Sequence, residues 1–150
     1  MDEQGQRQAV IKEALSWVGT PYHHMARKKG VGCDCLTFLA EVYERAGIIP
    51  HVDIPQYSNQ WHLHRTQERY QNGVSEYCVE TTERLPGNII MWKIGRVFSH
   101  AGIIVDYPII VHSLIKVGVQ KMDIEKPNGI LLTKDNVRRP VKYFDFWGGA

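Results

Sequence analysis

Two residues, a cysteine and a histidine, have the types and local contexts that nucleophilic catalysis requires. Cys35 stands where the loop sequence Gly32-Cys33-Asp34 passes into a helical pattern. A thiol attacks as the thiolate, which the positive end of a helix stabilises, and backbone N–H groups there can hold an oxyanion. His100 opens the apolar run His-Ala-Gly-Ile-Ile-Val, and an imidazole within reach of the thiol can take its proton and return it to a leaving amine. The pair predicts acyl transfer on cysteine, with an inert, packed thiol as the alternative.

A second histidine, His112, is spaced to orient the first. If the chain folds into a hairpin about Tyr107, His112 falls opposite Gly102, two residues from His100 and on the same face. A group bonded to the far nitrogen of a catalytic imidazole sets its tautomer and orientation. A half-buried sheet histidine without a chemical role is the alternative, and a register slip of one residue would turn His112 to the other face.

The elements that must position these residues are helical in the first half of the chain. Apolar residues at helical spacing predict helices over 8–18 and 35–46, each followed by a glycine. A more polar helix is predicted over 58–71, with a serine as its N-cap. The loop 20–32 contains the basic run 27–29, which we expect to be solvated.

The second half of the chain is β-prone. Five strands are predicted, at Ile89–Lys93, His100–Val105, Ile109–Ile115, Val117–Ile124 and near Val141–Trp147. Asp106-Tyr107-Pro108 separates the second of these from the third, as a hairpin turn would. Helices followed by an antiparallel sheet indicate an α+β fold, and we expect one domain over residues 1–150.

Composition excludes several classes of protein. With 43% hydrophobic and 23% charged residues and a formal net charge of +2, the 150-residue chain is expected to fold without binding nucleic acid. Three cysteines, an odd number, indicate free thiols rather than a disulfide framework. No secretory pattern opens the chain and no apolar run could span a membrane, so we expect cytoplasmic synthesis without membrane insertion. Without a zinc-ligand spacing or a glycine-rich phosphate loop, neither metal nor cofactor is expected.

Several motifs together resemble the NlpC-type cysteine peptidases. Residues 17–22 (Trp-Val-Gly-Thr-Pro-Tyr) and 32–38 (Gly-Cys-Asp-Cys-Leu-Thr-Phe) resemble the opening of that family, where a G-x-P-Y stretch precedes an Asp-Cys pair whose cysteine begins a helix. Three later segments follow in the family's order: 86–90 resembles its P-G-D strand entry, 99–103 its H-x-G-I strand, and 111–119 its later I-H-A and G-V.

The resemblance implies a papain-like fold and a specific chemistry. The activity would be hydrolysis of stem-peptide amide bonds in bacterial peptidoglycan, commonly beside γ-D-glutamyl or diaminopimelyl residues, through a thioester acyl-enzyme. The implied triad has Cys35 as nucleophile, His100 as base and His112 as orienter. Substrate contacts are implied for three further residues, Tyr22, Asp34 and Ser99, with capping of the helix as a second reading for Asp34.

Within the family, the chain looks most similar to short single-domain members encoded with phage tails and gene-transfer particles. They share the Gly-Cys-Asp-Cys-Leu run and a Tyr-Ser-x-x-Trp segment, here at 57–61. The similarity implies phage tail proteins as partners and delivery to the cell wall by a phage or tail-like particle. Two departures stand out: Leu36-Thr37 replaces the usual Ser-Gly, and Asn88 replaces an aspartate.

Two other functions stay open. An amidase or acyltransferase would use the same cysteine–histidine pair on a different acyl group, although related families with those activities often place the histidine before the cysteine. A tail component that keeps the fold without activity is the other. Against it, Cys35, His100 and His112 are all present.

Overall fold

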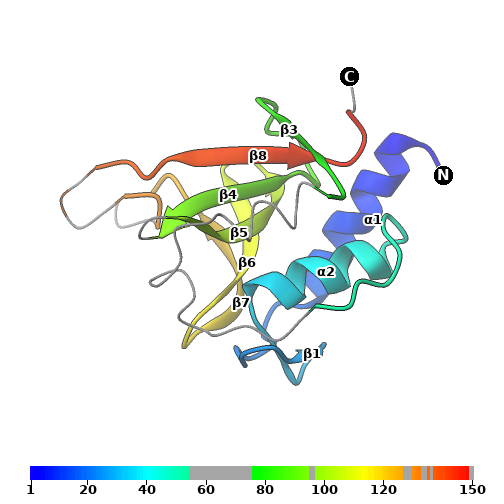
Figure 1. Cartoon of the computed structure of the whole chain (residues 1–150), viewed down its shortest axis with the longest axis horizontal. Coiled ribbons are helices and arrows are strands. Elements are labelled where there is room, and N and C mark those ends of the chain that lie inside the picture. Colours follow the sequence, from blue (N-terminus) through cyan, green and yellow to red (C-terminus); the bar gives the residue numbers. More distant parts are fainter. Residues whose placement is uncertain (55–75, 95–96, 127–129, 133–134, 136, 149–150) are drawn as a thin grey trace.

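The computed structural model describes residues 1–54, 76–94, 97–126, 130–132, 135 and 137–148. In this part of the chain, two helices pack against one face of a six-stranded antiparallel sheet (Figure 1). The α+β class is therefore confirmed. The predicted helix 58–71 and the segment 57–61 lie outside the described residues. Neither helix of the described part is long and apolar enough to cross a membrane.

The two helices differ in how well their predicted bounds match. Helix α1 spans Glu3–Ser16, whereas its apolar pattern predicted 8–18. It starts earlier because the Asp2 carboxylate accepts a hydrogen bond from the third helical residue and caps the first turn. Helix α2 spans Cys35–Arg45, as predicted to within a residue, and Gly47 follows it with a φ of 79°.

The inward face of α1 also differs from the predicted one. Leu15 and Val18, two of the apolar residues whose spacing predicted the helix 8–18, are exposed. The buried row includes an arginine, which an apolar pattern does not reveal; its members are Arg7, Val10, Ala14 and Trp17. These residues recur at intervals of three and four, so helical spacing holds although the face is rotated.

All five predicted strands are present, and a sixth joins them. In the order β3-β8-β4-β5-β6-β7, the sheet contains β3 (Val79–Thr81), β4 (Ile89–Ile94), β5 (Val97–Asp106), β6 (Ile109–Leu114), β7 (Gly118–Asp123) and β8 (Val141–Asp145). Strand β3 was not predicted because its Val-Glu-Thr sequence is short and mostly exposed. A separate two-stranded hairpin, β1 (Arg27–Lys28) with β2 (Gly32–Cys33), lies within the predicted loop.

The β5–β6 hairpin has the register that the sequence predicted. Ile103 pairs with Val111 and Ile104 with Ile110, and the next residues along the two strands are Gly102 and His112. A Cβ atom added to Gly102 would lie 3.1 Å from the Cβ of His112. The glycine thus leaves room for the imidazole beside it.

The sheet separates two apolar cores. The first lies between the sheet and the helices and includes Phe38 and Val42 of α2. The second lies on the other face and includes Trp92, Ile104 and Ile110, covered by the chain near Leu131. Each strand of the sheet's centre is therefore buried on both faces.

A β-bulge precedes His100. Trp92 pairs with His100 but Lys93 pairs with Phe98, so β5 has one extra residue, Ser99, at this point. Because of this insertion, Phe98 joins the helix-side core while His100 faces the opposite side with Trp92. Alternation alone would have put residues 98 and 100 on the same face.

Arg7 joins the beginning of the chain to its end. The Arg7 guanidinium donates to the carbonyl oxygen of Pro86 (2.9 Å), to Asn88 Oδ1 (2.7 Å) and to Asp145 Oδ2 (3.3 Å), and it lies 4.2 Å from the centroid of the Trp147 ring. The N- and C-terminal ends accordingly lie on the same side of the molecule (Figure 1). The asparagine at position 88 is part of this buried cluster.

Candidate active site

The start of α2, where Cys35 lies, is held by a capping box. Asp34 Oδ1 accepts hydrogen bonds from the backbone N–H groups of Leu36 (3.0 Å) and Thr37 (2.9 Å), and the Thr37 hydroxyl accepts one from the backbone N–H of Asp34 (2.9 Å). Thr37, one of the two departures from the family pattern, therefore completes the cap. The amides of Leu36 and Thr37 are committed to this cap and not to an oxyanion.

The second oxygen of Asp34 anchors the preceding loop. Asp34 Oδ2 accepts a hydrogen bond from the backbone N–H of Met25 (2.7 Å) and lies 3.7 Å from His24 Nδ1. The Asp34 residue is 1% exposed. Capping, one of the two roles that the sequence left open for Asp34, is thus observed, and contact with substrate stays a prediction.

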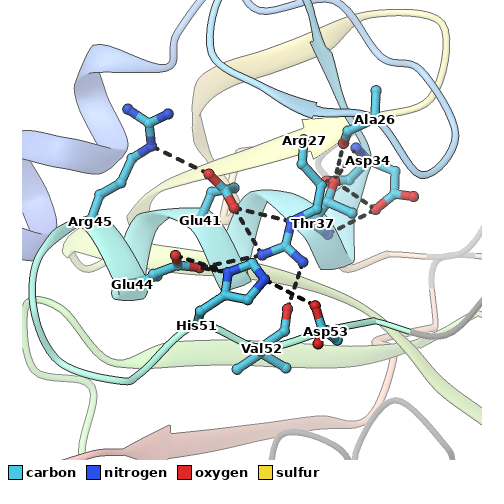
Figure 2. A network of polar contacts seen from close by, with 10 residues as sticks. All are labelled: Ala26, Arg27, Asp34, Thr37, Glu41, Glu44, Arg45, His51, Val52 and Asp53. Carbon is cyan, nitrogen blue, oxygen red and sulfur yellow. Dashed lines mark hydrogen bonds and ion pairs between the residues drawn. The ribbon is translucent and has the colours of Figure 1, made fainter.

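Arg27 connects the β1–β2 hairpin to α2 and to the connector that follows it (Figure 2). Its guanidinium donates to Glu41 (3.0 Å), to Glu44 (3.4 Å) and to the carbonyl oxygen of Val52 (2.6 Å). The expectation that the whole basic run is solvated was therefore wrong for Arg27. Its two acidic partners lie on α2, downstream in the sequence, and a local reading of the loop does not find them.

The two histidines meet, as the hairpin register predicted. His100 Nε2 and His112 Nδ1 are 3.1 Å apart, and both side chains are buried. Burial lowers the pKa of His112 to about 4, because the charged form loses its hydration there. His112 is therefore neutral at physiological pH and can accept a hydrogen bond at Nδ1.

The hydrogen bond between the two imidazoles decides which tautomer His112 must adopt when His100 is charged. Among the described residues the buried Nε2 of His112 has no hydrogen-bond partner. If His100 is to carry a positive charge, its Nε2–H must donate to His112 Nδ1, and the single proton of neutral His112 then lies on Nε2. This arrangement leaves Nδ1 of His100 for proton exchange with a thiol.

The start of α2 and the two histidines lie at the same end of the sheet. The thiol of Cys33 and the hydroxyl of Ser113, near the end of β6, are 3.7 Å apart, and Ser113 donates to the carbonyl oxygen of Cys33 (3.3 Å). Helix α2, which begins two residues after Cys33, packs against β5 and β6. Since β5 runs antiparallel to β6, the beginning of β5 with His100 lies beside this end of β6. The fold thus places the beginning of α2 near the end of the sheet that holds His100 and His112, and a contact between Cys35 and His100 stays a prediction.

Tyr22, a predicted substrate contact, borders the same region. Its backbone bridges to Cys33, and its side chain is half-buried. Burial raises the pKa of the Tyr22 hydroxyl, and the negative charges of Cys35 and Asp34 raise it further. Tyr22 is therefore a neutral hydrogen-bonding group beside the start of α2. The side chain of Ser99 lies outside the description.

The other two cysteines have environments that disfavour the thiolate. Burial raises the pKa of Cys33 to about 11 and that of Cys78 to about 12. Both therefore stay protonated and unreactive at neutral pH. In the described part of the chain, no group of three or more His, Cys, Asp and Glu residues could hold a metal ion.

Several solved structures share this fold. The chain superposes on the NlpC/p60 domain of the peptidoglycan hydrolase SagA with a TM-score of 0.56 at 18% identity, covering 79% of this chain and 90% of that one. For NlpC2 from Trichomonas vaginalis the TM-score is 0.63 at 14% identity, covering 96% of this chain and 47% of that one. The chain thus spans about half the length of NlpC2. No curated protein matches by sequence.

A third neighbour is described as non-catalytic. RipD from Mycobacterium tuberculosis, described as a non-catalytic NlpC/p60 domain protein adapted to peptidoglycan binding, superposes with a TM-score of 0.55 at 15% identity, covering 93% of this chain and 96% of that one. These likenesses confirm the papain-like α+β fold that the motifs implied.

A family model supplies the remaining finding. The model of the NlpC/P60 family matches residues 19–136, which include the capped start of α2 and both histidine strands. Because the match covers well over half of its 150 residues, the chain belongs to the NlpC/P60 family.

Proposed function

We propose that this protein is a cysteine endopeptidase that hydrolyses stem-peptide amide bonds of bacterial peptidoglycan. The observation that carries the proposal is the buried His100–His112 hydrogen bond of 3.1 Å, located at the end of the sheet where α2 begins with Cys35. A neutral acceptor behind His100 is the arrangement that an imidazole needs to take a proton from a thiol. Membership in a family whose solved members include a peptidoglycan hydrolase supports the substrate.

The proposed reaction has two stages. The Cys35 thiolate attacks the amide carbonyl carbon, and His100, protonated at Nδ1, gives that proton to the departing amine, which leaves a thioester. A water molecule then loses a proton to His100 and attacks the thioester. Sulfur leaves as the Cys35 thiolate, and the new carboxylic acid loses its proton to solvent to give the carboxylate. Throughout, His112 accepts the Nε2–H bond of His100 and stays neutral.

Mass spectrometry of muropeptides before and after incubation tests this function. New amino termini within stem peptides are expected with the native protein and none with Cys35→Ala. The Cys78→Ala variant is a matched control, since it removes a thiol whose pKa is raised and should retain activity. Cleavage that persists in Cys35→Ala would exclude the mechanism. Turnover of a lipid ester or small amide without release of stem-peptide amines would favour an amidase or acyltransferase.

A second candidate is binding to peptidoglycan without cleavage, which the likeness to RipD favours. Thiol labelling distinguishes the two. A catalytic site predicts that iodoacetamide modifies Cys35 selectively well below pH 8, because burial keeps Cys33 and Cys78 protonated. Equally slow alkylation of all three cysteines, together with retention of the protein on insoluble peptidoglycan, would support binding without cleavage.

Delivery by a phage or tail-like particle, with tail proteins as partners, is a further part of the proposal. It rests on the sequence resemblance alone, including the segment 57–61. Finding the protein by mass spectrometry in purified particles would support it. Its absence from particles but presence in the lysate would indicate a free lysin.

A further inference from the structure

Three aromatic rings form a closed group around the buried hydrogen bond. The ring centroid of Trp92 lies 4.7 Å from that of His100 and 6.0 Å from that of His112, and the two imidazole centroids are 5.4 Å apart. Trp92 is 1% exposed. The indole thus covers both partners of the hydrogen bond, at distances typical of favourable aromatic contacts.

The pairing of β4 with β5 places the Trp92 indole beside the His100 imidazole. Trp92 is the Cα partner of His100, and the bulge of β5 begins immediately beyond the pair. The bulge turns the preceding Phe98 to the other face, where the ammonium groups of Lys93 and Lys142 lie over its ring. The indole, rather than a lysine, is therefore what β4 presents to His100.

We propose that Trp92 is a positioning residue that holds His100 in its reactive orientation and stabilises its protonated form. This inference rests on the proposed function, in which His100 becomes an imidazolium when Cys35 is ionised. A cation within about 6 Å of an indole centroid is attracted to the ring's negative face, most strongly where water is excluded. The indole also excludes water from the bond between His100 and His112, which keeps His112 a neutral acceptor.

Titratable groups of the described residues lie near His100 on other strands of the sheet. From β6 the facing titratable group is His112. The proposed function adds Cys35, at the start of α2, as its reaction partner. Lys93 on β4 and Lys142 on β8 face Phe98 on the opposite side. Trp92 itself does not titrate. A change in the ionisation of the Cys35–His100 pair on substitution of Trp92, with every titratable residue kept, would report on the indole.

The test is the pH dependence of Cys35 alkylation by iodoacetamide, read by mass spectrometry in full-length variants. In Trp92→Leu, which keeps an apolar side chain without a π-face, the apparent pKa of Cys35 should rise by about 0.5–1.5 pH units. At a pH below both pKa values, this is a rate about 3- to 30-fold lower. Trp92→Phe keeps a smaller ring and should give a smaller shift in the same direction.

Controls separate positioning from packing. Ile104→Val thins the same buried core without touching the imidazole pair and should leave the pH profile unchanged. If Trp92→Leu does not fold, NMR titration of the His100 ring compares the imidazole pKa in Trp92→Phe with that in the native protein. If the apparent pKa of Cys35 is low in the native protein and unchanged in the Trp92 variants, the inference about Trp92 is overturned while the proposed function stands. If Cys35 of the native protein is alkylated with an apparent pKa of about 8.5, as for a free thiol, both the proposed function and this inference are overturned.

Discussion

The buried arginine of α1 offers the sharpest test of what holds this fold together. Arg7 is paired with Asp145 at 3.3 Å, and their side chains are 9% and 6% exposed. We consider Arg7→Met, which keeps an unbranched side chain of similar length in the pocket and removes the charge. The Asp145 carboxylate would then keep its hydrogen bonds from the backbone N–H groups of Trp147 and Gly148 but lose its cation.

The magnitude follows from that uncompensated charge. Removing one partner of a buried ion pair typically costs about 3–5 kcal/mol, out of roughly 5–15 kcal/mol for a whole domain. The loss also leaves the Pro86 carbonyl oxygen and Asn88 Oδ1 without the donor that now bonds them. For a domain of this size, about 1 kcal/mol shifts the melting temperature by roughly 2–4 °C. We therefore expect Arg7→Met to melt about 6–20 °C below the native protein.

Thermal and urea unfolding followed by circular dichroism measure the effect. Lys12→Met, on an exposed position of the same helix, is the matched control and should melt within about 2 °C of the native protein. Adding Asp145→Asn to Arg7→Met removes the stranded charge, so the double variant should lose less than the sum of the single losses. A loss for Arg7→Met no larger than that for Lys12→Met, or strictly additive losses, would refute the reasoning.

Four predictions concern the site. Cys35→Ala should unfold at the same urea concentration as the native protein, within error, while muropeptide cleavage is abolished; a large loss of stability would mean that the thiol is a packing residue. His112→Ala should lower kcat/KM by about 5- to 150-fold, because it leaves the buried Nε2–H of His100 without its acceptor. His100→Ala should cause a larger loss, and equal losses would mean that the roles are misassigned. Because the pKa of His112 is lowered to about 4 in the folded state, the unfolded chain binds the proton first as pH falls. The free energy of unfolding should therefore be constant above about pH 6.5 with respect to this group and drop by about 3 kcal/mol between about pH 6.5 and 4. His112→Gln should reduce that pH dependence, as measured by urea unfolding at each pH. Asp34→Asn keeps the Oδ1 cap but turns an amide N–H₂ toward the N–H of Met25, so it should cost about 1–3 kcal/mol in urea unfolding, and an unchanged midpoint would contradict the anchoring role.

Local patterns in the sequence determined a large part of this protein. Helix 35–46 followed from its apolar spacing and its closing glycine, and the hairpin about Tyr107 followed from turn residues between two β-prone runs. Because side chains alternate along strands, that hairpin alone predicted that His112 lies beside Gly102 and on the face of His100. These features depend on neighbours a few residues apart, which is why one sequence sufficed.

Only the tertiary structure decided features whose partners are distant in the chain. Arg7 is polar by type, yet it is buried because Asp145 and Asn88 meet it from the far end of the sequence. The bulge at Ser99 has no signature in the sequence, although it decides that Phe98 lies on the face opposite to His100. Trp92 was likewise not singled out, since an aromatic residue in a β-prone run reads as ordinary core. Periodicity reports which residues share a face of one element, whereas charge pairing and ring contacts depend on how separate elements pack.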